Sequence, residues 1–185
     1  MAIIRVGGHL GAGKTTLCKK LAEYLGYQYS YTGGIFREMA KERGLTIEEF
    51  YGHLVVDPVL EKSVDNRQVD LMMSKDNLVM EGRITAFLPC AFRPVNLFIK
   101  VDEAEGVRRQ MNRPENRGKK FEEMLTLSRQ RIQDERERYQ ALYQIPNHLD
   151  EKCYHIVVDS THLSPEELLS EVIRQIENYL KKPAA

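Results

Sequence analysis

Short apolar runs alternate with amphipathic stretches along this chain of 185 residues. The first run, Ala2 to Val6, is rich in Ile and Val and stops at Gly7-Gly8, as a buried strand ending in a turn would. Leucines then recur at every fourth position from Leu17 to Leu25, and Gly26 stands where a left-handed C-cap would lie. The chain is therefore predicted to begin with a strand, a turn and a helix.

The same alternation continues towards the C-terminus. Four more apolar runs predict strands, at residues 27–32, 78–80, 95–101 and 154–158. Helices are expected between them, including one over 33–43, two opened by a capping box at 46–49 and by Asp57-Pro58, one after Asp102, one over 121–143, and a last one opened at 164–167. This order predicts an α/β three-layer fold, a five-stranded parallel sheet with helices on both faces.

Functional groups gather at the carboxyl ends of strands in such a sheet. Four chemically suggestive residues fall at these predicted ends: Gly8, Thr32, Glu81 and Asp102. Asn112 to Lys120 interrupts the helical pattern with Pro and Gly and is typical of a mobile lid.

Composition narrows the class of protein. Lys plus Arg and Asp plus Glu number 27 each, so no overall field favours nucleic acid or membrane as a partner. The longest apolar runs are a handful of residues, too short to span a bilayer. Cys18, Cys90 and Cys153 form no CxxC pair, and the first strand follows the N-terminus at once, so we expect a cytoplasmic protein without disulfides. The five histidines show no metal-ligand spacing.

Between the first strand and the first helix the chain carries the pattern GxxxxGK[ST], in the context that this phosphate-binding motif requires. Its backbone N–H groups and the helix N-terminus would bind the phosphates of ATP, Lys14 would reach the outer phosphates, and the Thr15 hydroxyl would bind Mg²⁺. The ATP-binding residues predicted here are Gly8, His9, Leu10, Gly11, Ala12, Gly13, Lys14, Thr15 and Thr16. His9 is expected to contribute its backbone alone.

A regulatory GTPase also uses this loop. It needs an Asn-Lys-x-Asp guanine reader and an Asp-x-x-Gly switch, and the sequence contains neither. A small-molecule kinase remains.

A kinase that joins two phosphorylated molecules needs several cations in one cleft. Arg37 and Arg83 follow the second and third strands, and Arg131, Glu135 and Arg138 share one face of the long helix. A solvated helix with ion pairs explains that trio equally well. The arginines near the lid, Arg108, Arg109, Arg113 and Arg117, also suit a flexible basic loop or an RNA-binding patch, although only Phe121 is at hand for stacking.

Several stretches together resemble one family. They are Gly-Ala-Gly-Lys-Thr-Thr at 11–16, Thr-Gly-Gly-Ile-Phe-Arg at 32–37, Asp-Asn-Arg-Gln-Val at 65–69, Glu-Gly-Arg at 81–83, the trio from Arg131 to Arg138 with Tyr139, and Val-Asp-Ser-Thr at 158–161. The whole chain is similar to the short, archaeal-type cytidylate kinases, in the nucleoside-monophosphate kinase branch of P-loop proteins. The resemblance implies one kinase domain over 1–185, with a monophosphate-binding segment at about 32–75 and a lid at about 109–120.

The resemblance also implies roles for residues. Thr32, Arg37, Arg83, Arg131, Glu135 and Arg138 would line the monophosphate site, and Arg109, Arg113 and Arg117 would close over ATP. Lys14, Arg131 and Arg138 would be catalytic, with ATP and Mg²⁺ as the co-substrate and metal, Thr15 as the metal ligand, and CMP or dCMP as the acceptor. A monomer that binds only nucleotides is expected.

The acceptor base is the open part of this prediction. Many relatives carry an acidic residue or alanine where Gly34 stands, and larger bacterial cytidylate kinases have Asp in place of Ile84. The exocyclic amine of cytosine calls for a carboxylate acceptor, and Asp57, Asp65 and Asp70 are candidates, with simple surface solvation as the alternative for each. The other hypotheses are a kinase of the same fold for AMP, UMP or a small alcohol, and a non-catalytic ATP-binding regulatory protein.

Overall fold

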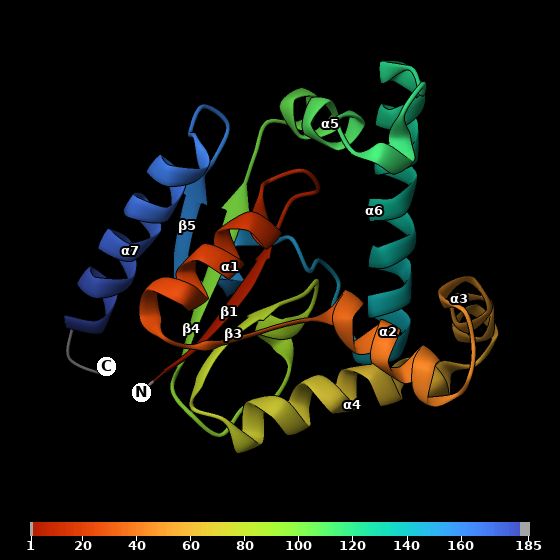
Figure 1. Ribbon diagram of the computed structural model, residues 1–185, viewed down its shortest axis with the longest axis horizontal. Helices are drawn as coiled ribbons and strands as arrows, with labels where there is room; N and C mark the ends of the chain where they lie inside the picture. Colours follow the sequence, from red (N-terminus) through yellow and green to blue (C-terminus); the bar gives the residue numbers. More distant parts are fainter. Residues whose placement is uncertain (1, 182–185) are drawn as a thin grey trace.

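A parallel β-sheet runs through the centre of the chain (Figure 1). The computed structural model describes residues 2–181, and of residues 51 and 54–56 it describes only the backbone. The strands are β1 (Ala2–Gly8), β2 (Gln28–Tyr31), β3 (Asn77–Glu81), β4 (Pro94–Lys100) and β5 (Ile156–Asp159). They lie in the order β2-β3-β1-β4-β5, and every pairing is parallel. The predicted five-stranded parallel sheet is confirmed.

Helices follow each strand, as the sequence pattern predicts. They are α1 (Lys14–Leu25), α2 (Thr32–Glu42), α3 (Ile47–Val56), α4 (Pro58–Ser74), α5 (Glu103–Met111), α6 (Phe121–Tyr143) and α7 (Pro165–Lys181), with short 3-10 turns at Thr85–Phe87, Pro114–Asn116 and Glu151–Cys153. Thr46 and Glu49 form the predicted capping box of α3, and Asp57 caps α4.

The strand boundaries differ from the sequence prediction by one or two residues, and two of these differences, at the end of the second strand and the start of the fifth, involve tyrosines. The second strand ends at Tyr31, and Thr32, expected to end the strand, instead begins α2. The ring of Tyr31 lies over this helix start, so closely that a Cβ on Gly34 would come 2.7 Å from its Cε1. Two glycines therefore let the helix start directly beneath an aromatic ring. At the other boundary, Tyr154 precedes β5 and contacts Phe98 edge to face.

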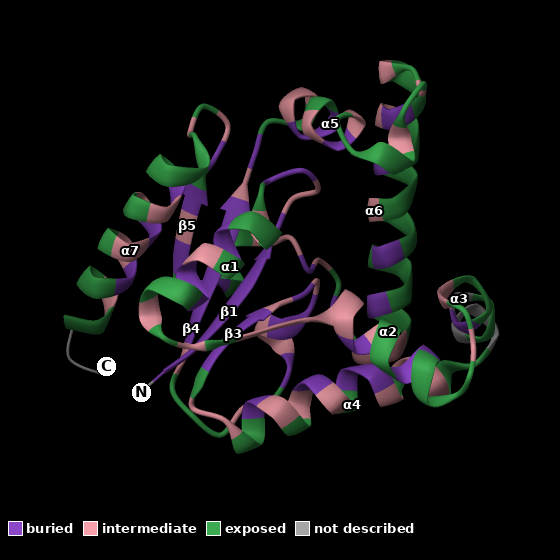
Figure 2. Cartoon of the chain, in the orientation of Figure 1, coloured by how far each residue is buried: buried purple, intermediate pink, exposed green. Residues whose placement is uncertain are grey.

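Alternate side chains of the strands pack against different helices, because successive residues of a strand point to opposite faces. On one face Ile4 and its neighbours pack with α1 and α7, and on the other Ile3 packs with residues of α4 and α6 such as Met72 and Tyr139. A separate apolar cluster around Phe50 joins α2, α3 and α4. Figure 2 shows that the three central strands, β1, β3 and β4, are almost continuously buried.

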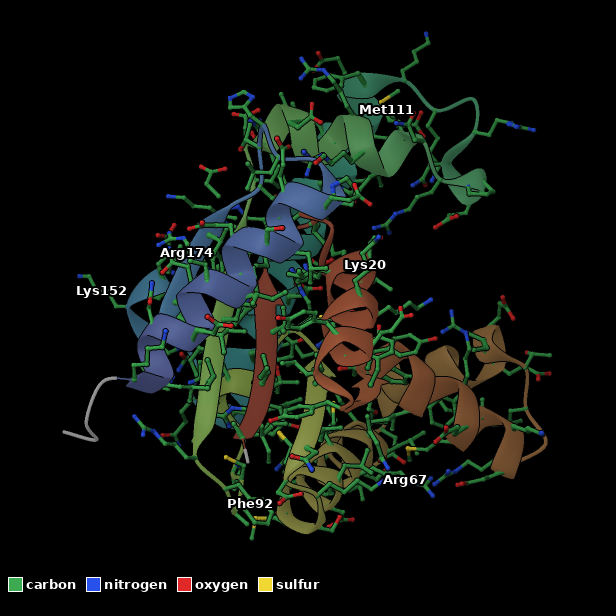
Figure 3. All side chains as sticks on the ribbon, turned by 60° about the vertical axis from the view of Figure 1, so that its left-hand side comes forward. Lys20, Arg67, Phe92, Met111, Lys152 and Arg174 are labelled. Atoms are coloured by element: carbon green, nitrogen blue, oxygen red, sulfur yellow. The ribbon has the colours of Figure 1, made fainter. Side chains whose placement is uncertain are left out.

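Ion pairs also join elements on the outside. Lys20 of α1 bonds Glu166, in the first turn of α7, at 3.0 Å, and Arg67 of α4 makes a bidentate pair with Glu42 of α2 at 2.7 and 2.8 Å (Lys20 and Arg67 are labelled in Figure 3). In the described part of the chain no helix is both long enough and apolar enough to cross a membrane.

Candidate active site

The glycine-rich loop connects β1 with α1 at the carboxyl end of the sheet. Gly11 and Gly13 have φ of 75° and 82°, in the left-handed region that favours glycine. A Cβ on Gly8 would lie 2.1 Å from the Ile99 carbonyl oxygen, and one on Gly11 would lie 2.1 Å from that of Gly106. The loop is thus held between the end of β4 and α5, and at these positions only glycine fits.

Lys14, the first residue of α1, folds back over the loop. Its Nζ donates hydrogen bonds to the Gly8 carbonyl at 3.1 Å and the His9 carbonyl at 2.6 Å. Burial, assisted by the nearby positive charge of Arg83, lowers the pKa of Lys14 to about 7. The ammonium group is therefore poorly solvated and well placed to gain from an anionic ligand.

The remaining loop residues divide between packing and exposure. The His9 ring lies edge to face on Phe98, and its Nδ1 is 3.0 Å from the Val101 carbonyl oxygen, so its side chain anchors the loop in addition to the backbone role that was predicted. Ala12 is buried, Leu10 is half-buried, and Thr16 is exposed. Phosphate contacts by these three would therefore come from the backbone or, at Thr16, from the hydroxyl.

Glu81 is a site residue that the sequence reasoning did not assign. It ends β3 beside the loop, where its carboxylate accepts hydrogen bonds from Thr15 Oγ1 at 2.8 Å and from the Tyr29 hydroxyl at 2.6 Å. Its signal in the sequence is an acidic residue at the end of the strand paired with β1. Hard oxygen donors of this kind suit Mg²⁺.

Metal binding by protein groups alone is not supported. Across residues 2–181, with the side chains of 51 and 54–56 set aside, no group of three or more His, Cys, Asp or Glu side chains could hold a metal ion. Two oxygen donors fit a Mg²⁺ that keeps several waters and is held largely by substrate phosphates, as Mg²⁺ usually is.

Glu135 holds two of the predicted arginines close to the phosphate loop. Arg83 donates to its carboxylate from Nε at 2.8 Å and also from Nη2, while Arg83 Nη1 donates to the Gly8 carbonyl at 2.8 Å. Arg131 Nε donates to the other carboxylate oxygen at 3.0 Å. One buried carboxylate therefore links the phosphate loop, the end of β3 and helix α6.

His148 lies beneath this group, with its Nε2 3.3 Å from Glu135. It is 1% exposed, and burial and the Arg83 charge lower its pKa, so it is neutral at pH 7. Burial opposes ionisation of Glu135, but His148 and the two arginines outweigh it and hold the pKa of Glu135 well below its usual range. The structure thus gives a structural role to a histidine whose spacing in the sequence carried no signal.

Two of the predicted acceptor residues stand apart from this group. Arg37 donates to the Tyr31 hydroxyl at 2.7 Å and to the Gly33 carbonyl at 3.2 Å, and Arg138 pairs with Glu61 of α4 at 3.0 Å. Both are exposed. The structure thus brings Arg83, Arg131 and Glu135 together. Arg37 and Arg138 are instead bonded to neighbouring protein groups, which a phosphate could replace as their partners.

Arg109 lies in the last turn of α5, inside the segment predicted as lid. Its Nη2 donates to the carbonyls of Ser160 at 2.8 Å and Thr161 at 3.0 Å, and its Nε pairs with Glu105. It lines a cavity of about 180 Å³ beside the loop, together with Ala12, Gly13, Thr16, Leu17, Leu163, Pro165 and Leu168. Arg113 and Arg117 are exposed in the connection beyond Met111 (Figure 3).

The three aspartates considered for base recognition have different surroundings. Asp57 caps α4 and lines an open cavity of about 470 Å³ between α2, α3 and α4. Asp70 is exposed, and Asp65 is buried. Asp57 is exposed as well, so Asp65 is the buried one of the three.

A phosphate-binding loop on a five-stranded parallel sheet, faced by arginines that converge on one carboxylate, defines a P-loop phosphotransferase. A family model described as "AAA domain" matches residues 4–131. The chain is 35% identical over 176 residues to the cytidylate kinase of Pyrococcus furiosus, covering 95% of this chain and 88% of that protein. It is 34% identical over 180 residues to that of Pyrococcus abyssi, with 97% and 96% covered. The chain belongs to the cytidylate kinase family.

Solved structures agree on the fold. A shikimate kinase from Bacteroides thetaiotaomicron superposes with a TM-score of 0.68 at 18% identity, covering 98% of this chain and 99% of that one. A shikimate kinase from Acinetobacter baumannii in complex with shikimate gives a TM-score of 0.62 at 21% identity, covering 98% and 95%. At these identities the likeness defines the architecture alone.

Proposed function

We propose that this protein transfers the γ-phosphoryl group of ATP to CMP or dCMP, producing CDP or dCDP and ADP. The observation that carries the proposal is Arg83, which bonds both the phosphate loop at Gly8 and the arginine-binding carboxylate Glu135. A cation in this position lies between the loop that would bind ATP and the arginines that would bind the acceptor phosphate. The similarity to archaeal cytidylate kinases supports CMP as the acceptor.

ATP would lie along the loop from Gly8 to Thr16, with Lys14 turning from the loop carbonyls to the outer phosphates. The adenosine end of ATP would lie in the cavity beside Arg109, whose apolar walls suit a base. Arg113 and Arg117 would close from the lid. Thr15 and Glu81 would hold Mg²⁺, which would neutralise phosphate charge during the transfer.

The acceptor phosphate would be bound by Arg37, Arg83, Arg131 and Arg138, with Thr32 at the start of α2. An oxygen of this phosphate attacks the γ-phosphorus as the bond to the β-phosphate oxygen breaks, and ADP leaves. The attacking oxygen is already anionic, so no general base is required. Catalysis then consists of positioning and charge stabilisation, which arginines held by Glu135 can supply.

We also propose that residues 1–185 act as one kinase domain, with an acceptor segment over 32–75 and a lid over 109–120, and as a cytoplasmic monomer. The balanced charge of the chain supports nucleotides as its partners over nucleic acids or membranes. Light scattering after size exclusion tests the monomer.

The activity itself is tested with purified protein, ATP and Mg²⁺, and a panel of CMP, dCMP, UMP, AMP, GMP and shikimate. CDP and dCDP should form fastest. A preference for AMP or shikimate would replace the proposed acceptor by another one, and ATP binding without turnover of any acceptor would point to a regulatory protein instead.

A further inference from the structure

A chain of hydrogen-bonded polar side chains, buried at Gln68 and Asp65 and partly buried at its two ends, joins α2, α4 and α6. Thr32 Oγ1 donates to Gln68 Oε1 at 3.1 Å, and Gln68 Nε2 donates to Asp65 Oδ1 at 2.6 Å. The hydroxyl of Tyr143, at the end of α6, donates to Asp65 Oδ2. Gln68 is 1% exposed and Asp65 8%, so the carboxylate is nearly removed from water.

This chain begins beside the phosphate-binding arginines. Gly82 immediately precedes Arg83, and a Cβ built on it would meet Thr32 Oγ1 at 2.6 Å, Thr85 Cγ2 at 2.5 Å and Gln68 Oε1 at 3.1 Å. Thr32, Thr85 and Gln68 therefore surround one point at the end of β3. A monophosphate bound at Arg83 could extend its nucleoside in this direction.

Thr85, whose methyl carbon is one of the atoms around Gly82, has unused hydrogen-bonding capacity, and so has Asp65. Within the residues that the structure describes, the hydroxyl of Thr85, which is 1% exposed, is buried without a hydrogen-bond partner, as are the two ring nitrogens of His148 beside Glu135. An ionised carboxylate has about four acceptor positions, and Asp65 uses two of them. Buried polar groups are normally satisfied, so this arrangement indicates that a ligand completes it.

The charge of Asp65 is not needed to join the helices. Of the charged groups that face it, Arg138 is paired with Glu61, and Glu61 adds a second negative charge. Burial, which outweighs the hydrogen bonds from Tyr143 and Gln68, raises the pKa of Asp65 to about 6. An asparagine could accept hydrogen bonds there without this cost.

We propose that Asp65 reads the acceptor base by accepting a hydrogen bond from the exocyclic amine of cytosine, with Gln68 as the residue that positions it. This inference rests on the proposed function. Uracil has a carbonyl oxygen where cytosine has the amine, and two acceptors facing each other leave both unpaired. Asp65 thus selects cytosine over uracil nucleotides.

The test is the ratio of kcat/KM for CMP to kcat/KM for UMP, measured for wild type, Asp65→Asn and a control, Asp70→Asn. The control makes the same chemical change at an exposed position of the same helix. Asp65→Asn should lower the CMP to UMP ratio by about 10- to 100-fold, because an amide can donate to the uracil carbonyl. Asp70→Asn should leave the ratio unchanged.

A second measurement uses pH and wild-type protein alone. Protonated Asp65 is a hydrogen-bond donor and can bond the uracil carbonyl oxygen. The ratio of kcat/KM for CMP to kcat/KM for UMP should therefore decrease as the pH falls from 8 to 5.5. In Asp65→Asn the ratio should stay constant over that range, apart from the ionisation of the nucleotide phosphates, which both acceptors share.

The outcomes separate the two proposals. Wild type that phosphorylates neither pyrimidine monophosphate refutes the proposed function. The second proposal fails by itself if the wild type prefers CMP and a folded Asp65→Asn variant has the same CMP to UMP ratio of kcat/KM as the wild type. In that case Asp65 does not read the base, and the proposed function stands. If Asp65→Asn does not fold, a CMP to UMP ratio in wild type that is flat between pH 8 and 5.5 refutes it equally.

Discussion

Among single residues, Lys14 shows most directly how the loop is prepared for an anion. Its ammonium group is bonded to two backbone carbonyls and has a pKa of about 7, so at pH 8 much of it is neutral. Phosphates would favour the charged form. The same residue therefore connects binding affinity with proton uptake.

At pH 8, binding of ATP should be accompanied by uptake of close to one proton by Lys14, and the uptake should shrink as the pH falls below 7. Calorimetry in two buffers of different ionisation enthalpy measures it. Lys14→Met should abolish the uptake and lower kcat by about 10²- to 10³-fold. Lys20→Met, on the outer face of the same helix, should change neither, and equal uptake in wild type and Lys14→Met would contradict the assignment.

In the proposed mechanism, Glu135 would act through the two arginines that it holds. Glu135→Gln keeps the shape but removes the charge that aligns Arg83 and Arg131, so kcat should fall about 10- to 100-fold with a smaller change in the KM for ATP. The matched control is Asp134→Asn, next in sequence but exposed. Steady-state kinetics distinguish them, and equal effects of both substitutions would show that only the net charge of α6 matters.

At the scale of elements, Arg109 of α5 and Leu163 in the loop after β5 form part of the wall of the cavity proposed for adenosine. Arg109 holds the helix and the loop together through the carbonyls of Ser160 and Thr161. It thereby sets the width of this cavity, whereas the neighbouring Arg108 points over the ring of Phe121.

Arg109→Ala should therefore raise the KM for ATP about 10-fold, through lost contacts and a looser wall, and leave the KM for CMP nearly unchanged. Arg108→Ala, one residue earlier and exposed, is the control and should resemble wild type. Initial rates with one nucleotide varied at a time decide the matter. If Arg109→Ala raised the KM for CMP as much as the KM for ATP, the substitution would have disturbed the site as a whole and the assignment of Arg109 to ATP would be contradicted.

Elements were predictable where the sequence carries local signals. The capping box at Thr46 and the proline after Asp57 define helix starts by their own chemistry, and the 23 residues of α6 follow from an uninterrupted helical pattern. The start of α2 at Thr32 was not predictable, because it depends on the Tyr31 ring packing over two glycines that usually signal a turn.

Site residues divide in the same way. The loop residues are found by spacing, since consecutive backbone groups bind the phosphates. Glu81, His148 and the pairing of Asp65 with Tyr143 depend on contacts between residues far apart in the chain, 78 positions in the last case. Spacing within one helix placed Glu135 near Arg131 but could not show that Arg83 completes the group.

At the scale of the whole molecule, Asp65 also sets a pH dependence of stability. Its pKa in the folded state, about 6, is above its ordinary value of 3.8, so folding favours the protonated form. The contribution to the free energy of unfolding is fully present below pH 3.8 and is lost as the pH rises through 6, at a cost of up to about 3 kcal/mol.

Asp65→Asn removes this cost and loses part of the hydrogen bonding, so at pH 8 it should be about 1 to 2 kcal/mol more stable than wild type. The advantage should disappear near pH 4. Urea unfolding at both pH values measures it, with Asp70→Asn as the reference. If Asp65→Asn were less stable than the wild type by the same amount at pH 8 and at pH 4, the charge of Asp65 would carry no cost and its role would be to stabilise the fold.

Arg83 bonds the Gly8 carbonyl of the phosphate loop and the Glu135 carboxylate of α6 at once. If ATP rearranges the phosphate loop when it binds, it must therefore also shift Arg83 and Glu135, which lie at the proposed binding site of CMP. Thermodynamic linkage makes such an effect reciprocal, so ATP and CMP should change each other's binding constants by the same factor. The two halves of the reaction would then assemble cooperatively in either order of arrival, and a futile attack by water would be disfavoured while one partner is missing.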